Sequence, residues 1–203
     1  DEPTSYLDIR YKLELLDILK RMAKEKGITV LMSLHEIDLA QKCADRIVCV
    51  RGEEIMAYGT PEEVFYEETI EKLYDLDNGS YNPLSGSLEL KKTEGEPEVF
   101  VISSGGNGTP IYRKLQREGR PFAAGILYTN DVDYQAARVL ASKIITEEPF
   151  EEISDNTYKN AENMIDQCQI VVNAGVHIGS CNHRMRNLLQ YAQEKGKLKR
   201  HYL

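Results

Sequence analysis

The chain opens on two adjacent carboxylates, Asp1 and Glu2, and these are the residues best suited to chemistry. At the carboxyl end of a buried strand, such a pair can divide the work of nucleotide hydrolysis. One carboxylate holds Mg²⁺, usually through water, and the next polarises the attacking water. Thr4, Ser5 and Asp8 follow at once and are placed to cap a helix. Taken alone, an Asp–Glu pair is more often a solvated surface pair, so its meaning depends on its neighbours.

The second residue that could do chemistry is His35, which follows the short apolar stretch Ile28–Leu34. That stretch is predicted to be a buried parallel strand. A histidine at the carboxyl end of such a strand points toward the ligand crevice of an open α/β sheet, where its ring N–H could donate to a γ-phosphate oxygen. An isolated histidine is more often a helix cap or a half-exposed residue.

These residues need elements to position them, and the sequence predicts alternating helix and strand. Apolar residues recur at three- and four-residue steps over 8–26, which predicts an amphipathic helix that ends at Gly27. A second helix is predicted over 36–44. A hairpin follows, with its strands at 46–50 and 55–58.

The order and spacing of these pieces closely resemble the carboxyl-terminal half of the ATP-binding subunit of ABC transporters. The combination of Leu-His-Glu with a following Leu-Ala is most similar to importers of iron-siderophore, haem and cobalamin. The resemblance covers residues 1–76 and depends on the following segments: Asp1-Glu2-Pro3-Thr4-Ser5, Leu7-Asp8, Ser33-Leu34-His35-Glu36-Ile37-Asp38-Leu39-Ala40, Ala44-Asp45-Arg46-Ile47-Val48 and Tyr58-Gly59-Thr60-Pro61-Glu62-Glu63-Val64.

The resemblance implies a role for each matching residue. Asp1 matches the Walker B aspartate that holds Mg²⁺, and Glu2 matches the catalytic glutamate. Ser5-Tyr6-Leu7-Asp8 matches the D-loop, in which Tyr6 replaces the commoner alanine and Asp8 is expected near the nucleotide. His35 matches the switch histidine. The family implies ATP and Mg²⁺ as cofactors. It also implies a homodimer of ATP-binding subunits beneath two membrane permease subunits, in the cytoplasm and peripheral to the inner face of the membrane.

The departures from the family pattern matter as much. The 203 residues contain no Walker A phosphate loop, no Q-loop and no Leu-Ser-Gly-Gly-Gln signature. The stretch 104–108 cannot stand in for the phosphate loop, because it lacks Gly-Lys-Ser/Thr and follows Asp1 instead of preceding it. The family places these elements upstream, so we expect a fragment. Without a phosphate cradle and its lysine, two carboxylates and a histidine cannot hold MgATP usefully.

Composition changes after residue 76. Residues 77–97 are rich in Asn, Gly, Ser and Pro and are predicted to be a linker with one short edge strand, Leu88–Leu90. Strands and helices alternate again over 98–203, which predicts a parallel sheet covered on both faces. The predicted fold is therefore α/β: the second half of an ABC-type P-loop ATPase domain joined to a three-layer Rossmann-like parallel-sheet domain.

The second part contains a glycine-rich turn between a strand and a helix, formed by Gly105, Gly106 and Gly108. Free backbone N–H groups at such a turn favour a small anionic ligand, and Asp131 or Asp133, after the next strand, lies where a ribose-binding acid would sit. The third glycine of the dinucleotide fingerprint is absent, because Ile111 occupies its place. A tight turn in an ordinary Rossmann-like domain explains the same glycines, and a stand-alone dehydrogenase is disfavoured.

The segment 177–183 also contains two histidines and a cysteine, which zinc would accept as ligands. The spacing fits no common zinc finger, and a loop that enters the last helix explains it equally well. A regulatory module that senses a nucleotide or metabolite remains the competing function for the second part.

Composition limits the classes of function. With 33 Asp and Glu against 25 Lys and Arg, the formal net charge of -8 argues against nucleic-acid binding as the main function, because an acidic protein does not replace the counterions of a phosphate backbone. The longest apolar run has seven residues and cannot span a bilayer. The four cysteines show no CxxC spacing and are predicted to be reduced cytosolic thiols.

Overall fold

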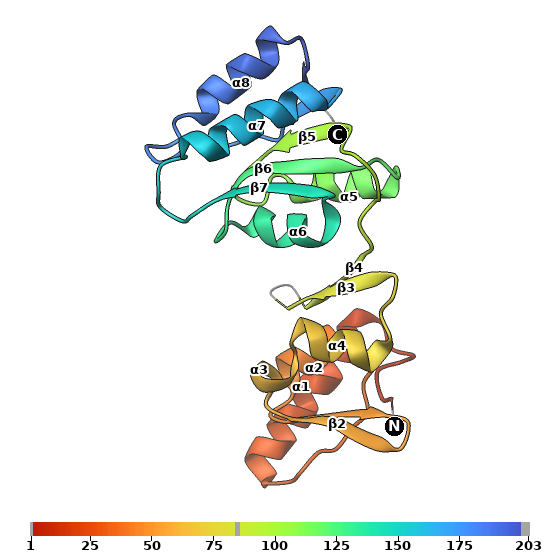
Figure 1. Cartoon of the computed structure of the whole chain (residues 1–203). Coiled ribbons are helices and arrows are strands. Elements are labelled where there is room, and N and C mark those ends of the chain that lie inside the picture. The colour runs from red at the N-terminus through yellow and green to blue at the C-terminus, as the bar shows by residue number, and fades with distance from the viewer. Residues whose placement is uncertain (1, 84–85, 200–203) are drawn as a thin grey trace. The chain divides into compact units, whose positions relative to one another are not determined.

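The computed structural model describes residues 2–83 and 86–199, and the chain forms two compact units (Figure 1). The first unit consists of Asp1–Asp77 and Tyr81–Leu88, and the second consists of Asn78–Ser80 and Glu89–Leu203. The stretch predicted as a linker holds two short strands, β3 (Gly79–Asn82) and β4 (Ser87–Leu90), which pair as a two-stranded sheet. β4 contains the predicted strand Leu88–Leu90, whereas β3 was not predicted.

The first helix matches its prediction. α1 runs over Ile9–Lys26 and ends at Gly27, whose φ of 64° is the left-handed conformation that glycine adopts readily. Asp8 occupies the N-cap position, but its side chain makes no capping hydrogen bond. Only Leu16 of this helix is buried, and Leu13 is 55% exposed. Much of the apolar face of α1 therefore has no packing partner among the described residues.

The predicted strand over Ile28–Leu34 is wrong. This stretch forms no strand and pairs with no other segment among residues 2–83 and 86–199. Leu31 is 91% exposed and Ile28 is 43% exposed, so the stretch is not buried either. A parallel strand requires a neighbouring strand whose N–H and C=O groups complete its hydrogen bonds. The apolar, β-branched composition predicted the strand, but the described residues of the first unit offer it no such neighbour.

The rest of the first unit packs around a small core. α2 (Ile37–Cys43) leads into the antiparallel hairpin of β1 (Ile47–Arg51) and β2 (Glu54–Gly59), as predicted. α3 (Pro61–Val64) and α4 (Glu67–Tyr74) follow. Elements from α2 to β3 bury one apolar cluster, which consists of Ile47, Cys49, Val64, Phe65, Ile70 and Tyr81.

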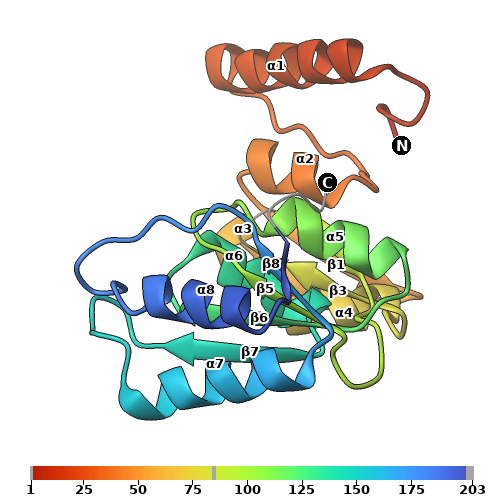
Figure 2. The same cartoon turned by 90° about the horizontal axis from the view of Figure 1, so that it is seen from above.

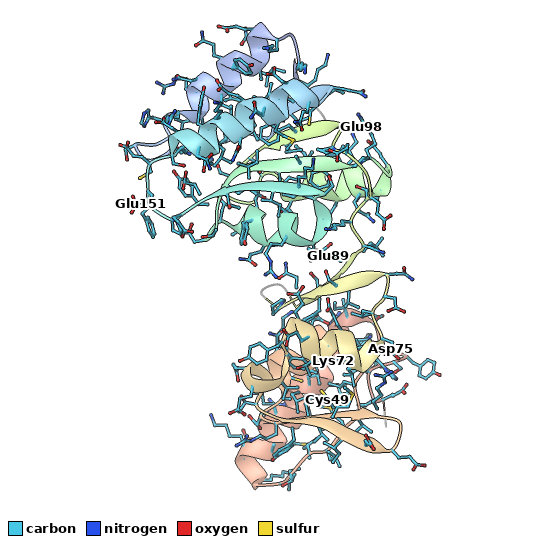
Figure 3. All side chains as sticks on the ribbon, viewed as in Figure 1. Cys49, Lys72, Asp75, Glu89, Glu98 and Glu151 are labelled. Atoms are coloured by element: carbon cyan, nitrogen blue, oxygen red, sulfur yellow. The ribbon has the colours of Figure 1, made fainter. Side chains whose placement is uncertain are left out.

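An arginine joins the hairpin to α4. The Arg51 guanidinium donates to the carbonyl of Lys72 at 2.9 Å and forms an ion pair with the Asp75 carboxylate. Figure 3 labels Lys72 and Asp75 at the end of α4, near the buried Cys49 of the hairpin. Because this end of a helix carries unpaired carbonyl groups, a cation is stabilising there. The contact fixes the end of α4 against β1.

The second unit is built on a five-stranded parallel sheet in the order β7-β6-β5-β8-β9. Its strands are β5 (Val99–Ile102), β6 (Phe122–Tyr128), β7 (Lys143–Glu147), β8 (Ile170–Asn173) and β9 (Leu198–Lys199). The chain starts at the central strand, builds outward to β7 and then crosses to the other side of β5. The carboxyl ends of β5 and β8 therefore meet where the strand order reverses, which is the usual ligand crevice of such sheets.

Helices cover both faces of this sheet (Figure 1 and Figure 2). α5 (Thr109–Arg117) and α6 (Val132–Leu140) pack on one face, and α7 (Asp155–Gln167) and α8 (Met185–Glu194) pack on the other. The strands are nearly continuous apolar runs because both faces are buried. The three-layer α/β arrangement is thus confirmed. The two edge strands, β7 and β9, were not predicted.

Candidate functional site

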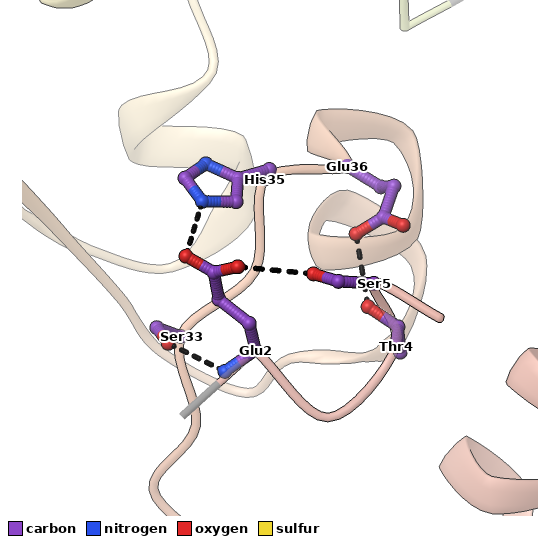
Figure 4. Close-up of polar contacts among 6 residues, drawn as sticks. All are labelled: Glu2, Thr4, Ser5, Ser33, His35 and Glu36. Carbon is purple, nitrogen blue, oxygen red and sulfur yellow. Dashed lines mark hydrogen bonds and ion pairs between the residues drawn. The ribbon is translucent and has the colours of Figure 1, made fainter. Parts of the chain in front are cut away.

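The loop after Glu2 turns back on itself and meets the segment before α2 (Figure 4). Glu2 has a φ of 43°, an uncommon conformation for a residue with a side chain. Its N–H donates to Ser33 Oγ at 2.9 Å, and its carboxylate accepts from Ser5 Oγ at 3.1 Å. The first contact joins two segments that are 31 positions apart in the chain.

The two residues predicted to do chemistry lie in direct contact. His35 Nε2 and Glu2 Oε1 are 2.6 Å apart, although the residues are 33 positions apart in the chain. Both side chains are open to solvent, with exposed fractions of 69% for His35 and 46% for Glu2. The hydrogen bond from His35, helped by that from Ser5, lowers the pKa of Glu2. Glu2 is therefore ionised at neutral pH, as a residue that polarises water must be.

Two of the three predicted caps of α1, Thr4 and Ser5, have other partners. Thr4 is fully buried, and its hydroxyl donates to Glu36 Oε2 at 3.0 Å, while Ser5 donates to Glu2. The other oxygen of Glu36 accepts from Lys12 of α1. Nothing in the sequence predicts the roles of Ser33 and Lys12, because contacts between residues so far apart leave no periodic pattern.

The other two residues assigned from the family pattern are Asp1 and Asp8. Asp1, expected to hold Mg²⁺, lies outside the described residues. Asp8 is exposed at the start of α1. Among residues 2–83 and 86–199, Glu2 and His35 are thus the matched pair that the fold brings together.

In the second unit, two aspartate carboxylates accept hydrogen bonds from the backbone N–H groups of the glycine-rich turn. The Asp131 carboxylate accepts the Gly105 N–H with both oxygens at 3.0 Å and also caps α6 by accepting the Asp133 N–H. The buried Asp133 accepts the N–H groups of Gly108 and Thr109 at 2.9 and 3.0 Å. These are the backbone donors that a bound anion would use at the start of α5.

The expected anionic ligand at this turn therefore meets an obstacle. A phosphate or carboxylate would have to displace Asp131 and Asp133, and their negative charges would repel it. Asp131, expected to bind a ribose, instead serves the protein's own backbone. Gly105 and Gly106 have φ values of 66° and 90°, so they are needed to form the turn itself. The structural explanation of these glycines is favoured over ligand binding.

The loops after β5 and β8 are tied together where the strand order reverses. Asn107 Nδ2 donates to the Gly175 carbonyl at 3.1 Å, and the His177 N–H donates to Ser104 Oγ at 3.1 Å. These bonds link residues 68 and 73 positions apart. The crevice that a parallel sheet of this order offers is thus partly bridged by the protein's own polar groups.

The stretch 177–183 shows no metal site. His183 Nδ1 lies 2.8 Å from the Ser180 carbonyl, and Cys181 Sγ donates to the Phe150 carbonyl at 3.4 Å. In the part of the chain that the structure describes, no three His, Cys, Asp or Glu side chains are grouped to hold a metal ion. Nor is any described helix both long enough and apolar enough to cross a bilayer.

Several known proteins with similar sequences are described as ATP-binding proteins of transport systems. The uncharacterized ABC transporter ATP-binding protein MJ0873 of Methanocaldococcus jannaschii is 38% identical over 128 residues, which are 63% of this chain and 44% of that protein. The ferric enterobactin transport ATP-binding protein FepC of Escherichia coli is 38% identical over 76 residues, 37% of this chain and 28% of that protein. The chain is homologous to ABC transporter ATP-binding proteins over part of its length.

A further ABC relative, the cobalamin import ATP-binding protein BtuD of Halobacterium salinarum, is 25% identical over 168 residues, 79% of this chain and 42% of that protein. This match and that to MJ0873 are each longer than either unit, so both include parts of the two units. The MJ0874 family model matches residues 122–199, within the second unit. The chain spans less than half the length of these ABC relatives, and no solved structure gives a significant match.

Proposed function

We propose that this chain is part of the ATP-hydrolysing subunit of an ABC importer for iron-siderophore, haem or cobalamin-type solutes. The observation that carries the proposal is the 2.6 Å contact between His35 Nε2 and Glu2 Oε1. In the family pattern these are the switch histidine and the catalytic glutamate. The class of solute is supported by the names of relatives, which specify cobalamin import, achromobactin transport and ferric enterobactin transport. The partners would be two permease subunits and a second ATP-binding subunit at the inner face of the cell membrane.

The chain's own residues account for the water-activating part of the reaction. The Glu2 carboxylate, with its lowered pKa, can accept a hydrogen bond from an attacking water and orient it. The His35 ring lies against that carboxylate and can donate from Nε2 either to Glu2 or to an incoming phosphate oxygen. Mg²⁺, when bound with ATP, would neutralise charge that develops on the transferred phosphoryl group.

The cofactor fits these residues only in part. The 203 residues supply a glutamate and a histidine for hydrolysis but contain no Gly-Lys-Ser/Thr loop to hold the β- and γ-phosphates. The proposal therefore assigns ATP binding to the intact subunit and assigns water activation to Glu2 and His35.

The test is Glu2→Gln in an intact subunit that carries these residues. The substitution keeps the shape of the side chain and removes the charge, so we expect ATP hydrolysis to fall by about 10²–10⁴-fold while ATP binding is kept. Asp38→Asn is a matched control, because the Asp38 carboxylate on α2 is 47% exposed and pairs with Lys42 at 3.5 Å. Hydrolysis at the parent rate by the Glu2→Gln subunit would refute the assignment.

A second candidate function concerns the second unit, which we propose acts as a regulatory module that binds a nucleotide or metabolite away from the donors that Asp131 and Asp133 occupy. Its support is that the matches to two ABC ATP-binding relatives include part of this unit. A thermal-shift screen of the whole chain against nucleotides, phosphosugars and corrinoids tests it. A ligand at a hundred times its Kd should stabilise the unit by about 2.7 kcal/mol. If none of these ligands shifts the transition, the module does not bind this class of ligand.

A further inference from the structure

Glu36 follows His35 directly, but its side chain turns away from the helix that it begins. It stands at the N-cap position of α2 and makes no side-chain capping bond. Its carboxylate instead reaches the other segment of the site, where one oxygen accepts from Thr4 at 3.0 Å and the other from Lys12 of α1 (Figure 4 draws the Thr4 contact). We call Thr4, Lys12 and Glu36 the carboxylate clamp.

The clamp is better protected from water than the pair beside it. Thr4 is fully buried, and the side chains of Lys12 and Glu36 are 19% and 26% exposed. Glu2 and His35 are far more open, and exposed ion pairs hold two side chains together only weakly. Water therefore competes less with the contacts of the carboxylate clamp than with the contact between Glu2 and His35.

Among the described residues, no strand pairing holds the segment that leads to His35. Residues 27–34, which lead to it, form no strand with any other described segment. In the part of the chain that the structure describes, polar contacts of residues 33–36 hold this segment against the loop after Glu2. Ser33 supplies one such contact through the Glu2 N–H, and the clamp supplies two more.

We propose that Glu36 is a positioning residue that sets the contact between His35 and Glu2 by binding Thr4 and Lys12. The inference rests on the proposed function, because it gives Glu36 a purpose in hydrolysis without contact to ATP. It also couples the position of α1 to that of His35, because Lys12 lies in the first turn of that helix. A displacement of α1 would move Lys12, release Glu36 and loosen His35 from Glu2.

The first test follows the His35 ring-nitrogen NMR signal in the whole chain. The Glu2→Gln variant gives the reference chemical shift of the His35 ring nitrogen when its carboxylate partner is absent. We expect Glu36→Ala to move the signal at least halfway to that position, and Lys12→Met to move it in the same direction. Asp38→Asn, which removes an exposed ion pair on α2, should leave the signal unchanged. Lys12→Met keeps the test valid if Glu36→Ala fails to fold.

Rescue separates positioning from general loss of stability. The exchange of Lys12→Glu with Glu36→Lys restores opposite charges at the same two places, and the Thr4 hydroxyl can accept as well as donate a hydrogen bond. We expect the double variant to return the His35 signal toward its parent position while each single variant does not. An unchanged signal in both Glu36→Ala and Lys12→Met would overturn the proposal, as would a double variant no better than either single one.

A measurement in the intact subunit distinguishes this proposal from the proposed function. Glu36→Ala should lower kcat for ATP by about tenfold or more and leave KM nearly unchanged, because the residue acts on His35 and Glu2 and not on ATP. If the NMR signal moves but both Glu36→Ala and Glu2→Gln hydrolyse ATP at the parent rate, the clamp stands and the proposed function fails. If Glu2→Gln abolishes hydrolysis and Glu36→Ala changes neither the signal nor kcat, the clamp fails alone.

Discussion

The Asp133 carboxylate accepts both the backbone N–H and the side-chain hydroxyl of Thr109, each at 3.0 Å. Its second oxygen accepts the N–H of Gly108 at 2.9 Å. Asp133 is fully buried, so these bonds replace the water that a carboxylate would otherwise bind. The start of α5 is therefore stabilised by a negative charge that the next helix supplies.

Replacement of this carboxylate should destabilise the second unit. Asp133→Asn would turn an NH₂ group toward a backbone N–H, which leaves buried donors unpaired and should cost roughly 1–3 kcal/mol of unfolding free energy. Urea unfolding followed by circular dichroism measures the loss. Asp155→Asn is the control, because the Asp155 side chain is 98% exposed and its ion pair with Arg184 should contribute no more than about 1 kcal/mol. Equal effects from the two variants would contradict this role of Asp133.

Glycine is required at position 108 because neighbouring side chains leave no room for a Cβ atom, and not because of its backbone conformation. A Cβ atom there would overlap Ser103 Oγ and lie 2.6 Å from the ring of Tyr112, which is fully buried. We expect Gly108→Ala to cost about 1–3 kcal/mol, as overpacked sites do. At Gly179 a Cβ would meet nothing closer than 3.9 Å, so Gly179→Ala should be close to neutral. Thermal melts of both variants give the comparison.

Much of the fold could be predicted because local patterns carry it. The spacing of apolar residues and a terminal glycine located α1, and turn residues located the hairpin of β1 and β2. Elements that depend on distant partners were harder. Ile28–Leu34 has the composition of a strand but no neighbour to pair with among the described residues. The edge strands β7 (Lys143–Glu147) and β9 (Leu198–Lys199) lack the continuous apolar run that marks the central strands.

In the candidate site, too, residues within local motifs could be predicted and residues that depend on distant partners could not. Glu2 and His35 could be matched through the order of motifs, since each lies within a short recognisable segment. Their supporting residues could not, because Lys12 and Glu36 are 24 positions apart and meet only after folding. In the second unit the glycine-rich turn predicts free backbone N–H donors, whereas Asp131 and Asp133, which follow the next strand, accept from those donors.

Acid should loosen the first unit through Glu36. The hydrogen bond from Lys12, and a smaller one from Thr4, lower the pKa of Glu36 from its ordinary value of 4.5. The unfolded chain therefore binds a proton more readily, so this contribution to stability is present above pH 4.5 and is lost as the pH falls through the lowered pKa. Urea unfolding between neutral pH and pH 3 should show a smaller acid loss in Glu36→Gln than in the parent. Parallel curves would contradict the prediction.

Cys168 should resist thiol reagents in the folded chain. It is 1% exposed, and burial raises the pKa of its thiol to about 11. The reactive thiolate is therefore both scarce and inaccessible at pH 8. Alkylation followed by mass spectrometry should label the partly exposed Cys181 well before Cys168, and urea should remove the difference. Equal labelling rates without urea would show that the core around Cys168 opens.

The 203-residue chain should not hydrolyse ATP by itself. It lacks a Gly-Lys-Ser/Thr loop, so Glu2 and His35 have no phosphate held before them. Phosphate release by the purified chain should equal that of its Glu2→Gln variant, which serves as the control for contaminating ATPases. Steady turnover that disappears in Glu2→Gln would mean that these residues suffice for activity.

The strand order of the second unit affects how the chain can fold as it leaves the ribosome. β5 is made first but lies at the centre of the sheet, with β6 on one side and β8 on the other. During synthesis β5, β6 and β7 can associate early, while the other edge of β5 waits for residues 170–173. Val99–Ile102 are fully buried in the finished unit, so an apolar edge stays open through that interval. This unit should therefore need a chaperone most while α7 is being made.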